Sequence, residues 1–346
     1  MRAFTCGVCG QLLFFENSRC LRCSSRLGFV PSRLDIVVLD DGAHAHPGAS
    51  TLRPCANQEL AQCNWVLEEG DPGPLCVSCR LTRTRPADDD PEDLAAFAKA
   101  EGAKRRLIFQ LLDLGLAIGD DLAFDLLSSR TGSVVTGHND GVITIDLAES
   151  DDARRARRRA ELGEPYRTML GHFRHEIGHY YWPILVEHTD GLERARALFG
   201  DDRVEYDAAL QRHYEQGPPS DWSERYVSAY ATMHPWENWA ETFAHYLHIR
   251  DTLETAAEFG LVVAGPVAAH DDSLSSVPVA EAAGLPFDAI VADWLPLTYA
   301  LNAINRSMGY EDLYPFTLAP AVIEKLAFVH DRVRAAARPP RVPVRR

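Results

Sequence analysis

The sequence predicts an α+β protein in which a small cysteine-rich module precedes a larger, mainly helical domain. All eight cysteines stand before residue 80. Beyond them, several stretches carry apolar residues at three- and four-residue steps, the period of a helix with one buried face. With 346 residues, the chain has room for such a division. We expect a module at residues 1–83, a main domain at residues 84–335 and a basic, proline-rich, disordered tail at residues 336–346.

The composition is that of a globular protein, with 46% hydrophobic and 25% charged residues. A net charge of −15 disfavours general affinity for nucleic acid or for an anionic membrane. No apolar run is long enough to cross a bilayer, and the first residues lack a signal-peptide pattern. We therefore expect a cytoplasmic protein, and in that reducing compartment clustered cysteines favour metal ligands over disulfides.

The cysteine spacing predicts two structural zinc sites. Two C-x-x-C knuckles stand close together, and a pair of knuckles completes a closed tetrahedral site. A second set has one knuckle and two cysteines at an irregular spacing, so its site rests on weaker evidence. Pairing between the sets stays open, and interleaved ligands are an alternative. His44 and His46 could substitute, although a solvated loop is the simpler interpretation. The expected ligands are Cys6, Cys9, Cys20 and Cys23, and then Cys55, Cys63, Cys76 and Cys79.

Zinc ribbons often bind nucleic acid, but this module contains no lysine and no basic stripe. We expect it instead to pack on its neighbour or on a protein partner. A short strand is expected at residues 34–39, between the two cysteine sets.

The first part of the main domain mixes helix and strand. A polar linker at residues 84–93 leads into a helix at 94–114, with Gly115 as its C-cap. Strands are expected at 124–127 and 141–147, the latter with the alternation of a half-buried strand. The arginine-rich stretch 151–161 has too few apolar residues to bury a face, so we expect an exposed helix there.

The most informative stretch, residues 171–182, contains His175-Glu176-x-x-His179 within a helical pattern. The pattern rests on Tyr166, Leu170, Phe173 and Ile177, with Pro165 near its start. On a helix, His175 and His179 lie one turn apart on one side, so both imidazoles can reach one metal. Glu176 can then reach a water on that metal without ligating it, which is the zinc-hydrolase arrangement. Coincidence is the alternative for so short a motif.

The second half of the chain is predicted to be helical. Helices are expected at 192–199, 204–216, 235–259, 289–308 and 320–335. Pro235 suits the first turn of the third of these, which puts Glu237 and Glu241 one turn apart on a single face.

Together, the His-Glu-x-x-His motif and the later Glu237-x-x-x-Glu241 resemble the gluzincin class of zinc metallopeptidases. More narrowly, the cysteine knuckles and the phrases at 164–182 and 234–246 resemble a bacterial family known as "putative zinc-binding metallopeptidases" with an N-terminal zinc ribbon. The resemblance covers nearly the whole chain and implies a zincin-like fold. It also implies peptide or amide hydrolysis with Glu176 as general base, Glu237 as third ligand and Glu241 orienting a ligating histidine.

The class can also carry a phenol facing the scissile carbonyl at the position of Tyr230, although an aromatic packed under the helix is equally compatible. One catalytic and two structural zinc ions follow, with a peptide or protein substrate. A non-catalytic zinc scaffold and a nucleic-acid-associated hydrolase are the alternatives. Other candidates are given packing, capping, cleft-lining or surface roles: His172, His188, His213, His234, His245, His248, Trp182, Trp236 and Trp239.

Overall fold

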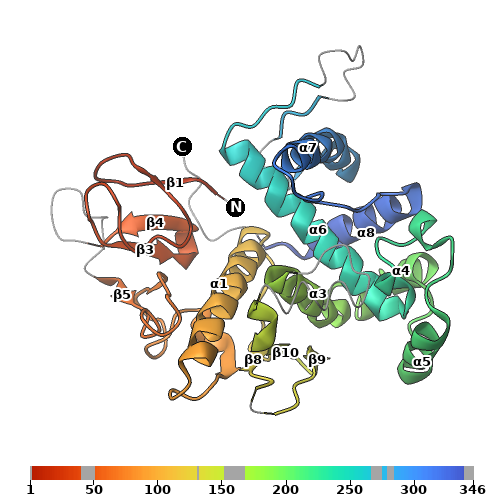
Figure 1. Ribbon diagram of the computed structural model, residues 1–346, viewed down its shortest axis with the longest axis horizontal. Coiled ribbons are helices and arrows are strands. Elements are labelled where there is room, and N and C mark those ends of the chain that lie inside the picture. Colours follow the sequence, from red (N-terminus) through yellow and green to blue (C-terminus); the bar gives the residue numbers. More distant parts are fainter. Residues whose placement is uncertain are drawn as a thin grey trace. The chain divides into compact units, whose positions relative to one another are not determined.

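The computed structural model describes residues 2–39, 51–130, 132–151, 168–265, 275–278 and 284–338 (Figure 1). Its described part combines seven α-helices with short strands, so the predicted α+β class is confirmed. The chain divides into two compact units: one of Met1–Glu161, Thr168–Phe173 and Ala337–Arg346, the other of Leu162–Arg167 and Arg174–Ala336. None of its described helices is long and apolar enough to cross a membrane.

The first unit begins with three two-stranded antiparallel ribbons. They pair β1 (Phe4–Thr5) with β2 (Leu12–Leu13), β3 (Leu27–Val30) with β4 (Asp35–Val38), and β5 (Arg53–Pro54) with β6 (Val66–Leu67). An aromatic cluster replaces the sheet core that such short strands cannot supply. The rings of Phe29 and Trp65 lie 4.7 Å apart between centroids, and Phe15 lies 5.3 Å from Phe109. Aromatic packing and metal ligation therefore hold this region, since each ribbon alone is too short for stability.

Phe109 belongs to α1 (Pro91–Asp113), the long helix of the first unit. Asp90 caps its N-terminus by accepting hydrogen bonds from two backbone N–H groups, and Pro91 fits the first helical position. At the other end Gly115 has φ +69°, the left-handed conformation that ends helices. Gly115 thus ends the helix as expected, although the C-cap residue itself is Leu114, one position earlier. The helix starts three residues earlier than expected because the acidic linker supplies its N-cap.

A four-stranded sheet completes this unit in the order β7–β8–β10–β9. The expected strands are β8 (Ala123–Leu127) and β10 (Val142–Asp146), which pair in parallel. Two further strands were not predicted: β9 (Gly137–Asn139), antiparallel to β10, and β7 (Thr82–Thr84), parallel to β8. Strand β7 spans the predicted boundary at residues 83/84, and the proposed division into three segments stays a prediction.

The second unit is helical and is arranged around α6 (Pro235–Glu258), the long diagonal helix of Figure 1. It packs against α8 (Pro320–Ala336), α4 (Leu192–Phe199) and α7 (Phe287–Ser307). Another helix, α5 (Tyr206–Gln216), lies at the surface. Helix α3 (Met169–Trp182), which belongs to this unit from Arg174 onward, continues through a single π-helical turn at Pro183–Glu187. Trp182 and Trp239 pack edge to face with centroids 5.5 Å apart, the packing role expected for them, whereas Trp236 is 40% exposed.

Helices α3 and α6 approach each other closely at Gly178. A Cβ atom there would lie 2.9 Å from the Cα of Ala240, closer than real side chains come. The indole Nε1 of Trp239 donates a hydrogen bond of 2.8 Å to the Gly178 carbonyl at the same crossing. Two small residues thus let the two backbones come together, which brings the polar residues of both helices within reach of one another.

Several expectations lie outside the described residues. They are the roles of His44 and His46, the helix at 151–161 apart from its first residue, Pro165 and Tyr166 in the central helix, and most of the tail, residues 339–346.

Candidate metal centre

Within the residues that the structure describes, three groups of side chains could hold a metal ion. The first two are the cysteine clusters, and they are not interleaved: one contains Cys6, Cys9, Cys20 and Cys23, and the other Cys55, Cys63, Cys76 and Cys79. A tetrahedral zinc with bonds of about 2.3 Å to sulfur needs sulfur atoms about 3.8 Å apart. The measured Sγ–Sγ distances are 3.6 Å for Cys6–Cys23, 3.6 Å for Cys9–Cys20 and 3.7 Å for Cys63–Cys76. Both clusters therefore fit the closed sites expected from their spacing.

The second cluster is the more deeply placed, since all four of its cysteines are buried. Helix α1 brings three charged side chains beside it. The Glu101 Oε2 lies 3.8 Å from the Cys79 Sγ, and Lys104, fully buried, donates to the Glu101 carboxylate at 2.6 Å. Arg105 donates to the Ala61 carbonyl at 2.9 Å. Four thiolates around one zinc carry two net negative charges and Glu101 adds a third, which the cations of Lys104 and Arg105 offset in part.

The third group contains His175, His179 and Glu237, where α3 and α6 meet. The Nε2 atoms of the two histidines lie 3.2 Å apart. The Glu237 Oε2 lies 2.9 Å from the His175 Nε2 and 3.4 Å from the His179 Nε2. Zinc bonds of about 2.0–2.1 Å to nitrogen and oxygen in a tetrahedron need edges of about 3.3–3.4 Å. The triangle of donor atoms therefore fits a zinc ion, with room in a tetrahedron for a fourth ligand.

The outer atoms of this triangle are held by other side chains. The His175 Nδ1 lies 2.7 Å from the Glu241 Oε1, whose Oε2 accepts a hydrogen bond of 2.5 Å from the Ser228 hydroxyl. The Tyr206 hydroxyl donates to the Glu237 Oε1 at 2.9 Å. Glu241 thus stands where a carboxylate can fix the tautomer and ring plane of His175.

The electrostatics of the cluster favour a positive charge between these groups. Burial opposes it, but the carboxylates of Glu237 and Glu241 still raise the pKa of His175 well above its usual value. Burial likewise opposes ionisation of Glu237, yet the neighbouring imidazoles lower its pKa well below normal. For Glu241 the hydrogen bond with His175 outweighs burial and lowers the pKa to about 2. A proton or a divalent cation can supply this positive charge.

Two further predicted residues lie beside the cluster. Glu176 is 8% exposed, and burial raises the pKa of its carboxyl group. Tyr230 starts a short 3-10 helix, Tyr230–Thr232, and its ring centroid lies 6.0 Å from that of His175. Burial and then the charge of Glu237 raise the pKa of Tyr230, which keeps its phenol protonated as a potential hydrogen-bond donor.

The remaining histidines take structural or flanking positions. His245 bonds to the Tyr314 hydroxyl at 2.6 Å, and His172 lies 4.0 Å from Glu149. His213 was predicted to be a surface residue, but its ring also packs edge to face on Tyr230 with centroids 6.0 Å apart. His234 caps α6 by accepting a hydrogen bond from the Trp236 backbone.

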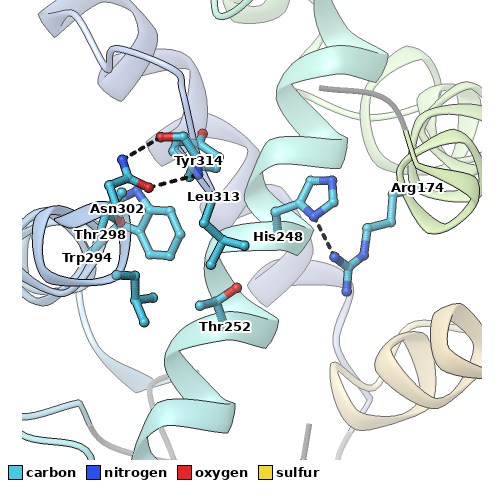
Figure 2. Close-up of a pocket in the computed structure, with 9 residues that line it drawn as sticks. Arg174, His248, Thr252, Trp294, Thr298, Asn302, Leu313 and Tyr314 are labelled. Carbon is cyan, nitrogen blue, oxygen red and sulfur yellow. Dashed lines mark hydrogen bonds between the residues drawn. The ribbon is translucent and has the colours of Figure 1, made fainter. Parts of the chain in front are cut away.

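A cavity of about 210 Å³ lies farther along α6 (Figure 2). The His248 Nδ1 faces Arg174 at 2.6 Å on one side of it, and Asn302 makes two hydrogen bonds with the Tyr314 backbone on the other. None of the three metal-binding candidates lines this cavity.

Sequence reasoning missed Tyr206 and Ser228, the two hydroxyls that hold the carboxylates of the cluster. Neither belongs to a recognisable motif. Tyr206 is the first residue of α5, and Ser228 lies in the segment before Tyr230. Only the position of Ser228, two residues before the aromatic already singled out, could have drawn attention to it.

Comparison with known proteins gives matches along the chain. The family described as "putative zinc-binding metallo-peptidase" matches residues 93–332, and a zinc-ribbon domain matches residues 3–90. Three relatives, one from Mycobacterium bovis and two from strains of Mycobacterium tuberculosis, are each 52% identical over 345 residues, covering 97% of this chain and 96% of their own length. Each bears the description "uncharacterized protein". No solved structure matches significantly.

Proposed function

The chain belongs to the family of zinc-binding metallopeptidases that carry an N-terminal zinc ribbon, and we propose that it hydrolyses peptide bonds at the His175/His179/Glu237 cluster. Family membership supports a zinc hydrolase at a coarse level. Peptide hydrolysis is supported by the triangle of donor atoms at His175, His179 and Glu237, which lies next to the buried carboxylate of Glu176. Glu176 is not one of the three donors. A purely structural site has no need of such a base.

His175, His179 and Glu237 would hold the catalytic zinc, and the two cysteine clusters would hold structural zinc. When bound, zinc supplies a Lewis acid that polarises a carbonyl and lowers the pKa of water to about 7. Glu176 takes the proton released as the water attacks, and then delivers it to the departing amine. Tyr230, whose phenol stays protonated, donates a hydrogen bond to the oxygen on which negative charge develops.

Glu241 has a separate task in this proposal. Its Oε1 accepts a hydrogen bond from the Nδ1–H of His175, which leaves the Nε2 lone pair free to bind the metal. The Ser228 hydroxyl donates a hydrogen bond to the second oxygen of Glu241, which keeps the carboxylate oriented toward the His175 imidazole. We propose a peptide or protein as the substrate, a cytoplasmic location suited to eight metal-binding thiols, and a protein contact as the role of the ribbon module.

Replacing Glu176 by Gln tests the proposal. The variant should keep the zinc content of the wild type, because Glu176 is not a ligand, and lose at least about 10²–10⁴-fold in turnover. Zinc per chain is measured by elemental analysis and hydrolysis with a mixed library of quenched fluorescent peptides. A Glu176→Gln enzyme that cleaves as fast as the wild type would remove the assigned base. A wild-type protein with zinc at the site and no cleavage of any library member would favour the alternative, a non-catalytic zinc scaffold.

A further inference from the structure

We propose that Tyr206 is a positioning residue, which holds the outer carboxylate oxygen of Glu237 so that only the other oxygen faces the metal. The inference rests on the proposed function for its meaning, but its test reads metal binding rather than hydrolysis. Nothing in the sequence motifs or in the family match assigns a role to Tyr206.

The two oxygens of Glu237 have different partners. Oε2 lies 2.9 Å from the His175 Nε2 and 3.4 Å from the His179 Nε2, which places it at a corner of the donor triangle. Oε1 accepts the hydrogen bond from the Tyr206 hydroxyl at 2.9 Å. Because Glu237 is only 3% exposed, water has little access to Oε1, and the phenol is its protein donor. The carboxylate is therefore turned to bind through one atom.

His234 sets the distance between Tyr206 and Glu237. Its Nδ1 accepts a hydrogen bond of 3.1 Å from the Trp236 backbone N–H, so its ring proton is on Nε2. That Nε2 lies 2.9 Å from the carbonyl of Val204, two residues before Tyr206, to which it donates. The Tyr206 ring also packs on His234 with centroids 5.2 Å apart. The buried His234 imidazole thus links the N-terminus of α6 to the segment just before α5 through two hydrogen bonds.

Burial of α5 cannot position Tyr206 by itself. Ala209 is the single buried residue among the eleven of this helix. Its N-terminus is fixed locally instead, because the Glu205 side chain accepts a hydrogen bond of 2.8 Å from the Ala208 backbone N–H. The Tyr206 phenol is therefore positioned by this N-cap and by the two hydrogen bonds of His234, and it meets Glu237 at the start of α5.

The hydrogen bond from Tyr206 to Glu237 affects the coordination number of the bound metal. A carboxylate bound through one oxygen leaves a three-ligand site open at its fourth position, as catalytic zinc sites require. Without the phenol, Glu237 is free to turn about its terminal bond and offer both oxygens, or to swing away. Zinc should then bind more weakly and with a changed geometry, by the 10–100-fold usual when a group supporting a ligand is lost.

The test compares Tyr206→Phe with Tyr214→Phe, a phenol on the same helix that is 71% exposed. The full chain is treated with chelator until two zinc ions per chain remain, and zinc affinity at the third site is measured by competition with a chromophoric chelator. Co²⁺ is then added at the same site and its visible spectrum recorded. Tyr206→Phe should bind zinc about 10–100-fold more weakly and shift the cobalt bands, whereas Tyr214→Phe should match the wild type.

His234→Asn provides a second variant, should Tyr206→Phe fail to fold. Asparagine keeps the N-cap acceptor of α6 but is too short to reach the Val204 carbonyl, so it should lower zinc affinity in the same direction. Wild-type zinc affinity and cobalt bands in a folded Tyr206→Phe protein, or an equal drop in melting temperature with and without zinc, would overturn the inference. Absence of peptidase activity in the wild type would count against the proposed function alone.

Discussion

In the proposed function, the cysteine clusters and the His175/His179/Glu237 site both hold a cation, but they do so in opposite ways. Each cysteine cluster uses four thiolates drawn from turns close in sequence, and the second is buried on all sides. The other site offers three donors of mixed type from two helices, with His175 and Glu237 separated by 62 positions. The Tyr206 hydroxyl and the Glu241 carboxylate contact two of these donor residues, and the Ser228 hydroxyl holds Glu241 in turn.

The two kinds of site therefore serve different purposes: the cysteine clusters stabilise the fold, and the histidine site is proposed to react. A thiolate cage completes its own coordination and so can replace a hydrophobic core in a module of short strands. An open site binds its ion less completely, and the surrounding helices must supply the missing rigidity. Changes at the cysteines should therefore affect folding most, and changes at the histidine site should affect metal binding and turnover most.

The largest effect is expected for Cys76→Ser. Structural zinc contributes about 10–16 kcal/mol in small zinc modules, as much as the whole stability of an ordinary domain. We expect the first unit to lose its fold, measured as loss of near-ultraviolet circular dichroism and of one or more zinc ions. Cys23→Ser, at a partly exposed cysteine of the first cluster, is the matched control and should cost less. Equal melting temperatures for Cys76→Ser and the wild type would contradict the structural role.

Next in size is the contrast between Glu237 and Glu241. Glu237→Ala removes a ligand and should abolish stoichiometric zinc at this site while both cysteine clusters keep theirs. Glu241→Ala removes only the support of His175 and should weaken zinc binding about 10–100-fold, or about 1.4–2.7 kcal/mol. Zinc titrations that gave the reverse order would exchange the two roles.

Tyr230→Phe should act on turnover alone. A donor aimed at the developing oxyanion is worth about 2.7–4 kcal/mol, or about 10²–10³-fold in kcat. Zinc content and melting temperature should stay at wild-type values, since the ring is retained. A lower melting temperature with undiminished kcat would show that the aromatic packs under α6 and does not take part in the reaction.

The smallest effect is expected at the crossing of α3 and α6. Gly178→Ala would place a Cβ 2.9 Å from the Ala240 Cα, and such overpacking costs about 1–3 kcal/mol. Gly102→Ala, in the middle of α1, meets only the Arg105 Nη2 at 3.9 Å, an ordinary van der Waals contact, and should stabilise by about 0.5–1 kcal/mol. Chemical denaturation measures both. If the two substitutions changed stability in the same direction, the close approach would not explain Gly178.

The elements that depend on the local spacing of residues could be predicted from the sequence. The cysteine sites follow from the C-x-x-C spacing, and the helix carrying His175 and His179 follows from apolar residues at three- and four-residue steps. The helix carrying Glu237 and Glu241 follows from a proline in its first turn. Strands β7 and β9 were missed because three residues carry no usable alternation, and their pairing with β8 and β10 depends on the tertiary fold.

The supports of the site were missed for a related reason. Tyr206 and Ser228 reach Glu237 and Glu241 across separations of 31 and 13 positions, and neither has a neighbour in sequence that marks it. His213 was assigned to the surface because nothing in α5 predicts its contact with Tyr230. Side chains that support a ligand are chosen by the packing of helices, which a single sequence does not display.

The burial of the second cysteine cluster also governs when its metal can enter. Cys55, Cys63, Cys76 and Cys79 are all buried, and Phe29, Trp65 and Phe109 pack in the core of the same unit, so we expect zinc to reach these thiols only when the unit opens. Metal loading must then accompany folding, and exchange with labelled zinc in solution should be as slow as the opening of the unit itself. The partly exposed Cys9 and Cys23 give the first cluster a faster route. The zinc content of the second cluster should therefore depend on the zinc available while the chain folds, and it should change little afterwards.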